Sequence, residues 1–353
     1  MSLPLIGATT VACTSDAAND DGARTRTNSS SPALAVPTSL RGVEPPVHTE
    51  LVALDAVEGV RYEELINLLG WVKEAAPEHG GIAVGRSAFA GLESACPQQL
   101  RTMPSFAGDL LDPARSHGDV LVQIGGRDEL IVREAVRLVL GGAGTQWRVR
   151  WRLSGIREGS RTEEGRGLNK NPFHFTEGFG NPEGQGGIAD RALVRAGGKE
   201  PKWAVGGSYQ VVRIIQMATS LWDADSKEEQ ERIIGRRRDG RWLDGTPSGE
   251  RPDFASDPRG RATPLDSHVR LAAPDRRNPP AMVRRSYAYH RDDVDHGLIF
   301  SCFQRDLGAG FEAVQRRLRH EAMAKYVLTV GGGYFFVPPP NDSWAEVFQQ
   351  KEL

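Results

Sequence analysis

The sequence has little cysteine, no long apolar run and no excess of either charge. Its three cysteines, Cys13, Cys96 and Cys302, lie far apart and form no CxxC pair, which excludes a disulfide framework and a cysteine-rich zinc site. No segment reaches the ~20 consecutive apolar residues of a membrane-spanning helix, so the sequence predicts no membrane span. Lys and Arg total 44 against 46 Asp and Glu, which argues against a protein that binds nucleic acid through its phosphates.

The chain is long enough for one large domain or two smaller ones. Its 353 residues are 39% hydrophobic and 25% charged, which is typical of a soluble globular protein. Residues 1–45 differ, because they begin with an uncharged stretch and continue rich in Ser, Thr, Asn, Ala and Pro. We expect a disordered leader there. The alternative is a remnant export signal, since residues 3–6 and 10–13 are faintly similar to such a signal, although its basic start is missing.

Residues 46–172 alternate between strand and helix patterns. The clearest period of two lies at residues 147–153, where apolar side chains alternate with arginines. The patterns predict strands at 50–55, 119–124 and 147–153, and helices at 60–76 and 128–140, the second of them stopped by Gly141-Gly142. The stretch that opens at Gly80-Gly81 contains Pro97, Pro104 and Pro113, so we expect it to be irregular, with short helices as the alternative.

The same order returns in residues 173–353. The patterns predict strands at 209–217, 298–303 and 334–337, and helices at 227–234 and 311–324. The fold class is therefore α+β, with two ferredoxin-like modules of antiparallel sheet and peripheral helices at residues 46–172 and 173–353. Residues 236–291 interrupt the second module with a polar excursion that contains seven prolines. A loop of that length is uncommon unless it builds a site, so we expect the site there.

Two segments supply a carboxylate and an imidazole suited to a buried site. Glu177 lies among aromatic residues and precedes Gly178 and Gly180, which let a backbone approach a flat ligand closely. The alternative is an ordinary turn with an exposed glutamate. His268 stands alone within the excursion and is either a hydrogen-bonded structural residue or an axial haem ligand.

Two arginine clusters admit two interpretations each. Arg284-Arg285 is flanked by apolar and aromatic residues, so one guanidinium can point inward as a fixed positive charge; the alternative is solvated surface charge. Arg236 begins a run of three arginines after a predicted helix. These arginines either bind acidic groups such as propionates or decorate a helix end, where cations oppose the helix dipole.

Taken together, these segments resemble the dye-decolorizing (DyP-type) haem peroxidases, most of all their exported deferrochelatase/peroxidase subgroup. The resemblance runs from about residue 51 to residue 337 and includes residues 206–209, 266–271, 284–289 and 331–336. It implies the DyP-type peroxidase fold, with one haem b per chain held by the second module.

The resemblance also implies roles for single residues. His268 matches the proximal iron ligand and Arg284 the distal arginine. A further set matches positions that border the porphyrin: Gly178, Phe179, Gly180, Arg236, Ala273, Pro274 and Asp275. We also expect Asp306, at the exit of a predicted strand, to accept a hydrogen bond from the other ring nitrogen of His268 and so increase electron donation to iron.

The chain departs from the family's Gly-x-x-Asp-Gly motif at two positions. Glu177 replaces the aspartate and adds a methylene, which moves its oxygens by roughly a bond length. His174 replaces the first glycine, and it is strained if the backbone has a positive φ there. His174 is therefore an additional distal acid–base group, a partner of Glu177, or an outward-facing side chain.

The implied activity is peroxidase chemistry, in which Glu177 moves a proton, Arg284 stabilises developing negative charge, and His268 donates to iron. The implied partners are hydrogen peroxide and an aromatic, dye-like reducing substrate. The alternatives are a haem enzyme repurposed for one small-molecule oxidation in secondary metabolism, and a haem- or iron-handling protein. The resemblance favours export, whereas a merely disordered leader favours the cytoplasm. The oligomeric state stays open, with a homodimer as the commonest closed assembly.

Overall fold

The computed structural model describes residues 40, 45–161, 167–182, 184–250, 252–275 and 279–351. The predicted leader at residues 1–45 lies outside this part of the chain, except for Leu40 and Pro45. Within these ranges, no helix combines the length and the apolar character needed to cross a bilayer.

The N-terminal half forms a four-stranded antiparallel sheet with two helices. Its elements are β1 (His48–Ala56), α1 (Tyr62–Ala75), β2 (Gly80–Gly85), β3 (Val120–Gly126), α2 (Glu129–Ala143) and β4 (Trp147–Ile156). The strands lie in the order β4-β1-β3-β2, which is the order of a ferredoxin-like sheet. Two predictions fail here, because the stretch that opens at Gly80 begins with a strand and α2 continues through Gly141-Gly142.

The C-terminal half repeats this order in the sequence β12-β8-β11-β9. Its main elements are β8 (Ser208–Met217), α4 (Thr219–Asp223), α5 (Lys227–Ile234), α6 (His268–Ala272), β9 (Val283–Arg284), β10 (Tyr287–His290), β11 (His296–Gln304), α7 (Ala313–Leu318) and β12 (Val327–Val337). The helix predicted at 311–324 is broken, since α7 ends at Leu318 and a separate 3₁₀ turn covers Ala322–Tyr326.

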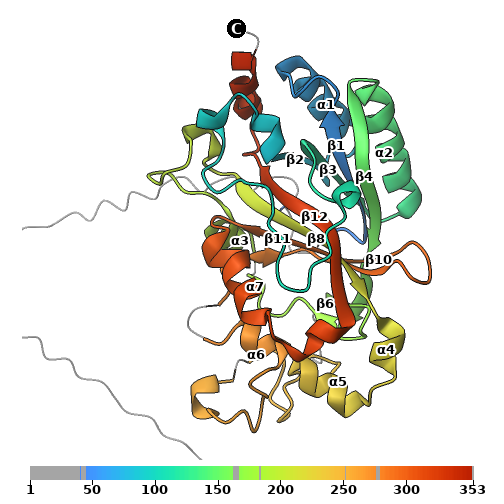
Figure 1. The fold of residues 1–353 in the computed structure, drawn as a ribbon, viewed down its shortest axis with the longest axis vertical. Coiled ribbons are helices and arrows are strands. Elements are labelled where there is room, and N and C mark those ends of the chain that lie inside the picture. The colour runs from blue at the N-terminus through green and yellow to red at the C-terminus, as the bar shows by residue number, and fades with distance from the viewer. Residues whose placement is uncertain are drawn as a thin grey trace, which may run out of the picture. The chain divides into compact units, whose positions relative to one another are not determined.

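The two halves share one nine-stranded sheet. β12 pairs with β2 through Phe335 and Gly85, and β10 pairs with both β4 and β11, so the row of strands closes on itself. Alternate side chains of β1 enter two separate cores: Val52 and Leu54 pack under α1 and α2, whereas Leu51 and Ala53 pack against the facing strands. Figure 1 shows α1 and α2 side by side on the N-terminal half.

The elements that build the site come from the connections of the C-terminal half. A small sheet of β5 (Glu158–Arg161), β6 (Gly167–Lys170) and β7 (Thr176–Glu177) precedes α3 (Gly184–Ala192). In Figure 1, α4, α5 and α6 gather at the end of the sheet away from α1 and α2, with β6 nearby. Within the excursion of residues 236–291, α6 contacts α7, and β9 and β10 pair with β11.

Candidate active site

A cavity of about 340 Å³ lies between α6, α7, the strands of the C-terminal half and the β6–β7 segment. Eight of the residues predicted for the site line it: Glu177, Gly178, Phe179, Gly180, Arg236, His268, Ala273 and Arg284. The other four predicted residues, His174, Pro274, Asp275 and Asp306, are not among its lining residues within the described ranges. Arg157, Asn169 and Asn171 also line the cavity, and all other lining residues belong to 173–353.

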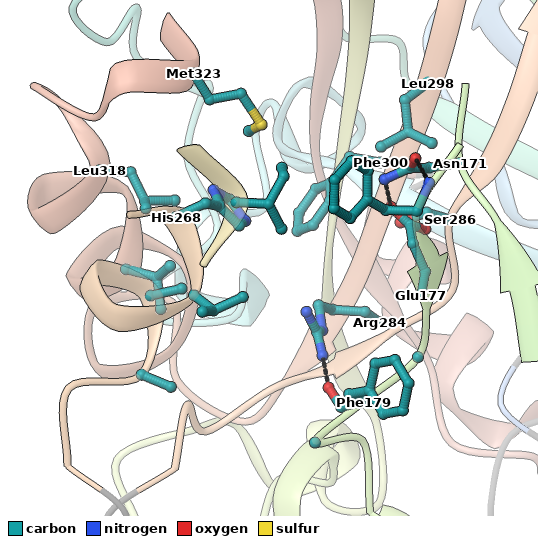
Figure 2. A pocket seen from close by; sticks show the side chains of 18 of the residues that line it. Asn171, Glu177, Phe179, His268, Arg284, Ser286, Leu298, Phe300, Leu318 and Met323 are labelled. Carbon is teal, nitrogen blue, oxygen red and sulfur yellow. Dashed lines mark hydrogen bonds between the residues drawn. The ribbon is translucent and has the colours of Figure 1, made fainter. Parts of the chain in front are cut away.

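His268 is the first residue of α6 and faces this cavity (Figure 2). Its side chain is 29% exposed, and its Nδ1 lies 2.6 Å from Glu321 Oε2. Burial alone lowers the pKa of His268, but the charge and hydrogen bond of Glu321 outweigh burial, so the pKa is raised. Because Nδ1 is committed to Glu321, Nε2 is the ring nitrogen left for a ligand in the cavity.

Glu321 occupies the position that we predicted for Asp306, and that prediction is wrong. Asp306 Oδ1 instead accepts a hydrogen bond from the backbone N–H of Ala309, 2.8 Å away, at the start of the helical turn Gly308–Glu312. The broken helix explains the error, because the chain changes course after Leu318 and brings Glu321 against His268.

Two buried or half-buried arginines fix α6 in place. Arg270 donates to the carbonyl of Thr263 (2.6 Å) and to the Asp257 carboxylate (3.0 Å), which ties α6 to the excursion. Arg317 of α7 donates to two carbonyls at the C-terminal end of α6, each at 2.8 Å. A helix of one and a half turns is marginal on its own. These charge-assisted hydrogen bonds therefore hold the position of His268.

Glu177 lies across the cavity from His268, at the end of β7 (Figure 2). Its Oε1 accepts a hydrogen bond from Asn171 Nδ2 at 3.0 Å, and its Oε2 lies 3.5 Å from Asn169 Nδ2. The carboxylate therefore lies at the cavity wall, where the side-chain amides of Asn169 and Asn171 donate to its two oxygens. Neither asparagine was predicted, because nothing in the spacing of residues 169 and 171 shows that their amides turn toward residue 177.

His174 lies outside the cavity, and its predicted acid–base role is wrong. Its φ is +70°, which makes it one of two described residues other than glycine with a positive φ. The turn directs the ring outward, where it is 49% exposed and its Nε2 lies 3.1 Å from Asp223 Oδ1. The outward orientation, with a strained backbone, is the alternative that the structure confirms.

Arg284 projects from β9 into the cavity and donates to the carbonyl of Phe179 (Figure 2). Its backbone is fixed by Asn181, which accepts from the Arg284 N–H at 3.0 Å and donates to the Arg284 carbonyl at 2.9 Å. The guanidinium is thus held beside Phe179, two residues after Glu177.

Arg236 lies between two aromatic rings at the cavity wall. The centre of its guanidinium is 4.6 Å from the Phe179 ring centroid and 3.8 Å from that of Trp242. It also donates to the carbonyl of Gly240 at 2.6 Å. Stacking on both faces holds the cation in one orientation. Trp242 was missed by the sequence analysis, because a tryptophan in a loop carries no periodic signal.

The remaining walls are mostly apolar, with a few polar lining residues such as Arg213, Gln315 and Thr329. Phe173 stacks on the buried Trp222 with ring centroids 4.3 Å apart, and Trp222 packs edge-on against Tyr326 at 4.9 Å. The apolar lining residues include Phe175, Met217, Leu298, Phe300, Leu318 and Met323. The cavity is thus a largely hydrophobic slot with His268 on one side and Glu177 on the other, and Arg213, Arg236 and Arg284 also belong to its wall.

Comparison with known proteins identifies the family of this chain. The model for the N-terminal domain of Dyp-type peroxidases matches residues 80–157, and that for the C-terminal domain matches residues 169–342. The chain belongs to the Dyp-type peroxidase family. The resemblance inferred from the sequence and the α+β DyP-type fold are thereby confirmed.

The chain is similar to deferrochelatases in sequence and to solved Dyp-type peroxidases in structure. Deferrochelatases from Escherichia coli (strain K12) and Shigella flexneri are each 38% identical to it over 276 residues, or 73% of the chain. The matched region spans 64% and 65% of those relatives, just under two thirds of their length. Ferric DtpA from Streptomyces lividans is 31% identical with a TM-score of 0.75, over 85% of this chain and 90% of that one.

Two further solved structures have a similar fold. A DyP-type peroxidase from Streptomyces coelicolor is 32% identical with a TM-score of 0.75, over 86% of this chain and 96% of that one. A DypB variant from Rhodococcus jostii, solved in complex with heme, is 20% identical with a TM-score of 0.66 over 87% of this chain and 96% of that one, and shows the fold alone.

Proposed function

We propose that this chain is a haem-dependent peroxidase that reduces hydrogen peroxide and oxidises aromatic, dye-like substrates. The observation that carries the proposal is the cavity in which His268, backed by Glu321, faces Glu177 and Arg284. An imidazole whose second nitrogen is bound by a carboxylate is a suitable axial ligand, because the carboxylate fixes the tautomer and raises the basicity of the ring.

The residues around the cavity fit haem b. The slot has apolar walls, and one wall is backbone at Gly178, where φ is +103° and an added Cβ would lie 2.9 Å from Leu168 Cδ2. His268 would hold the iron, and the stacked Arg236 suits a propionate. Of the predicted border residues, Ala273 lines the slot, whereas Pro274 and Asp275 follow it outside the lining. Haem, when bound, supplies an iron that binds peroxide and takes up its oxidising equivalents.

The chain's own side chains supply proton transfer and charge stabilisation. Glu177 accepts a proton from one peroxide oxygen at its carboxylate and returns it to the other oxygen. Arg284 keeps its charge in this largely apolar slot and stabilises the negative charge that develops on the outer peroxide oxygen before that oxygen takes up the proton and leaves as water. The aromatic and aliphatic walls exclude water, which strengthens both electrostatic interactions.

Absorption spectroscopy of the haem-reconstituted protein with a peroxide pulse tests the proposal. We expect wild type to bind one haem and to react rapidly, His268→Ala to lose tight haem binding, and Glu177→Gln and Arg284→Leu to keep haem but react at least ~100-fold more slowly. His174→Ala is the matched control, because its ring lies outside the cavity. A colourless reconstituted protein, or full reactivity in both distal variants, would overturn the proposal.

The name of the curated relatives supports a second candidate function, in iron handling. Deferrochelatases are 38% identical to this chain. Incubating the haem-bound protein with a ferrous chelator, without peroxide, separates the two functions. Release of iron that is unaffected by Glu177→Gln and Arg284→Leu would favour iron handling. Fast reaction with peroxide but no turnover of dyes would instead favour oxidation of one particular small molecule.

The module boundaries and the assembly belong to the same proposal. We infer that residues 173–353 hold the haem and that residues 46–172 complete the closed sheet, because all but three of the described lining residues belong to the second range. For the assembly, a homodimer is the candidate to test, because it is the commonest closed assembly. Analytical ultracentrifugation of the full chain would distinguish a dimer from a monomer.

A further inference from the structure

We propose that Asn171 and Asn169 are positioning residues that fix the carboxylate of Glu177 toward the cavity. The proposal rests on the function proposed above and concerns the position at which this chain carries glutamate instead of the family's aspartate. A longer side chain has one more rotatable bond, so its oxygens stay in one place only if other groups hold them. The two asparagines provide that restraint.

Asn171 is held in one orientation by the turn that it caps. Its Oδ1 accepts hydrogen bonds from the backbone N–H groups of Phe173 and Phe175, at 3.1 and 3.0 Å. Its backbone carbonyl also accepts from the N–H of His174 at 2.9 Å. Because the amide oxygen is occupied twice, the Nδ2 donor must point the other way, and it lies 3.0 Å from Glu177 Oε1.

Asn169 is oriented from another direction. This buried residue of β6 accepts a hydrogen bond at Oδ1 from Arg157, at 2.5 Å, which turns its Nδ2 toward Glu177 Oε2 at 3.5 Å. Arg157 in turn donates to the carbonyl of Ser286 at 3.0 Å. The restraint on Glu177 thus extends to the segment between β9 and β10 through Arg157.

The consequence is a carboxylate with one donor on each oxygen and its remaining lone pairs free for the cavity. Both donors are amides without a titratable proton, so they hold Glu177 without competing for the proton that it moves. The charged or titratable groups that line the cavity together with Glu177 are Arg157 after β4, Arg213 of β8, Arg236 after α5, His268 of α6, Arg284 of β9 and Glu321. Arg157 is linked to Glu177 through Asn169, which accepts from Arg157 and donates to Glu177.

The variant Asn171→Asp tests this inference. The substituted side chain keeps an oxygen for the two backbone N–H groups but places a second carboxylate against Glu177 in place of a donor. Two carboxylates at this distance share one proton, which raises one of their pKa values by about 2 units or more. We expect the acid limb of the peroxide reaction rate to move upward by about 2 pH units. Gln315→Glu is the control, since it adds one carboxylate to the cavity wall from α7, and we expect a clearly smaller movement.

A second measurement uses the haem-free protein and does not depend on activity. In the double variant Asn171→Asp/Glu177→Gln, donor and acceptor exchange places, so the hydrogen bond is restored. We expect Asn171→Asp to lower the thermal unfolding midpoint by several degrees, and the added Glu177→Gln to recover more than half of that loss. Independent, additive effects of the two substitutions, or an acid limb unmoved in Asn171→Asp, would overturn the positioning role. If wild type does not react with peroxide, the proposed function fails, and the unfolding comparison alone decides this inference.

Discussion

Replacing Gly240 with alanine tests how the aromatic–arginine stack shapes the cavity. Gly240 has a φ of +97°, and a Cβ added to it would lie 2.1 Å from Phe179 Cζ and 2.4 Å from Cε2. The Phe179 ring therefore cannot keep its place in Gly240→Ala. Its displacement removes one face of the stack on Arg236 and shifts the backbone carbonyl that accepts a hydrogen bond from Arg284.

The expected cost has two parts. A residue other than glycine with left-handed φ costs about 1–2 kcal/mol, and overpacking against the ring costs about 1–3 kcal/mol more. Gly245 offers a matched control in the same loop, since its φ is +93° and an added Cβ would meet nothing within 4 Å. Gly245→Ala should therefore cost about 1–2 kcal/mol from the backbone alone. The difference between the two variants isolates the contact with Phe179.

Urea unfolding of the haem-free protein measures both costs, and haem titration measures the effect on the cavity. We expect Gly240→Ala to lose an additional ~1–3 kcal/mol of unfolding free energy relative to Gly245→Ala. We also expect it to bind haem more weakly and to react more slowly with peroxide, whereas Gly245→Ala should match wild type in both. If Gly240→Ala and Gly245→Ala have equal unfolding free energies and equal haem affinities, the contact between residue 240 and Phe179 does not shape the cavity wall, and the prediction is refuted.

Three further predictions concern groups around the cavity. Glu321→Gln should retain haem but raise its reduction potential, because a neutral amide increases the basicity of His268 less than a carboxylate does; a redox titration that shows no change would contradict this. His174→Gly should raise the unfolding free energy by about 0.5–1 kcal/mol, since it relieves the positive φ and loses only an exposed contact with Asp223, and should leave the peroxide rate unaltered. The backbone N–H of Thr263, with further donors that include Arg270, lowers the pKa of Asp257 in the folded protein. The ionised Asp257 therefore stabilises the fold fully above its ordinary pKa of about 3.9. This stabilisation is lost as the pH falls through the lower pKa of the folded state. Asp257→Asn should therefore destabilise the protein near neutral pH and flatten the pH dependence of urea unfolding below about pH 4. Curves that stay parallel at every pH would contradict that assignment.

Most of the strand and helix order could be predicted from hydrophobic periodicity, and two of the failures lie at glycines. Gly80 was taken as the start of an irregular stretch, yet β2 begins there. An added Cβ at Gly80 would lie 2.5 Å from the Ala76 carbonyl, so the glycine serves a close approach between the end of α1 and the strand. A glycine needed for tertiary contact looks, in sequence, the same as one that ends an element.

Gly142 shows the same ambiguity in a helix. We predicted that Gly141-Gly142 stops the helix, but α2 continues to Ala143. The Trp71 ring of α1 lies so close that an added Cβ at Gly142 would be 2.2 Å from it. The glycine therefore creates room for a helix–helix contact, and the helix ends at Gly144, where φ is +62°. Whether a glycine ends a helix or makes room for a neighbouring helix depends on which helix packs against it. The local sequence does not show that neighbour.

The cavity-facing side of the site was predictable from motif order, whereas its supporting residues were not. His268, Glu177 and Arg284 are the residues that face the cavity, and the segments that carry them match the family. Their supports are Glu321 and Asn171, which reach them through a helix break and a side-chain turn. Neither feature has a periodic signal. Predicting Asp306 instead of Glu321 was the result of treating residues 311–324 as one continuous helix.

The supports also explain how this chain accommodates two departures from the family motif at once. Asn171 holds Phe173 and Phe175 in the turn that gives His174 its positive φ, and the same side chain donates to Glu177. The turn that strains residue 174 therefore also directs the amide that fixes the longer carboxylate. A substitution that relaxes the turn without moving Asn171, such as His174→Gly, should leave the carboxylate in place, whereas a change at Asn171 should disturb both. Asn171 thus connects the two departures, His174 and Glu177. Of the two, only Glu177 faces the cavity, so we expect only its contact with Asn171 to affect the peroxide reaction.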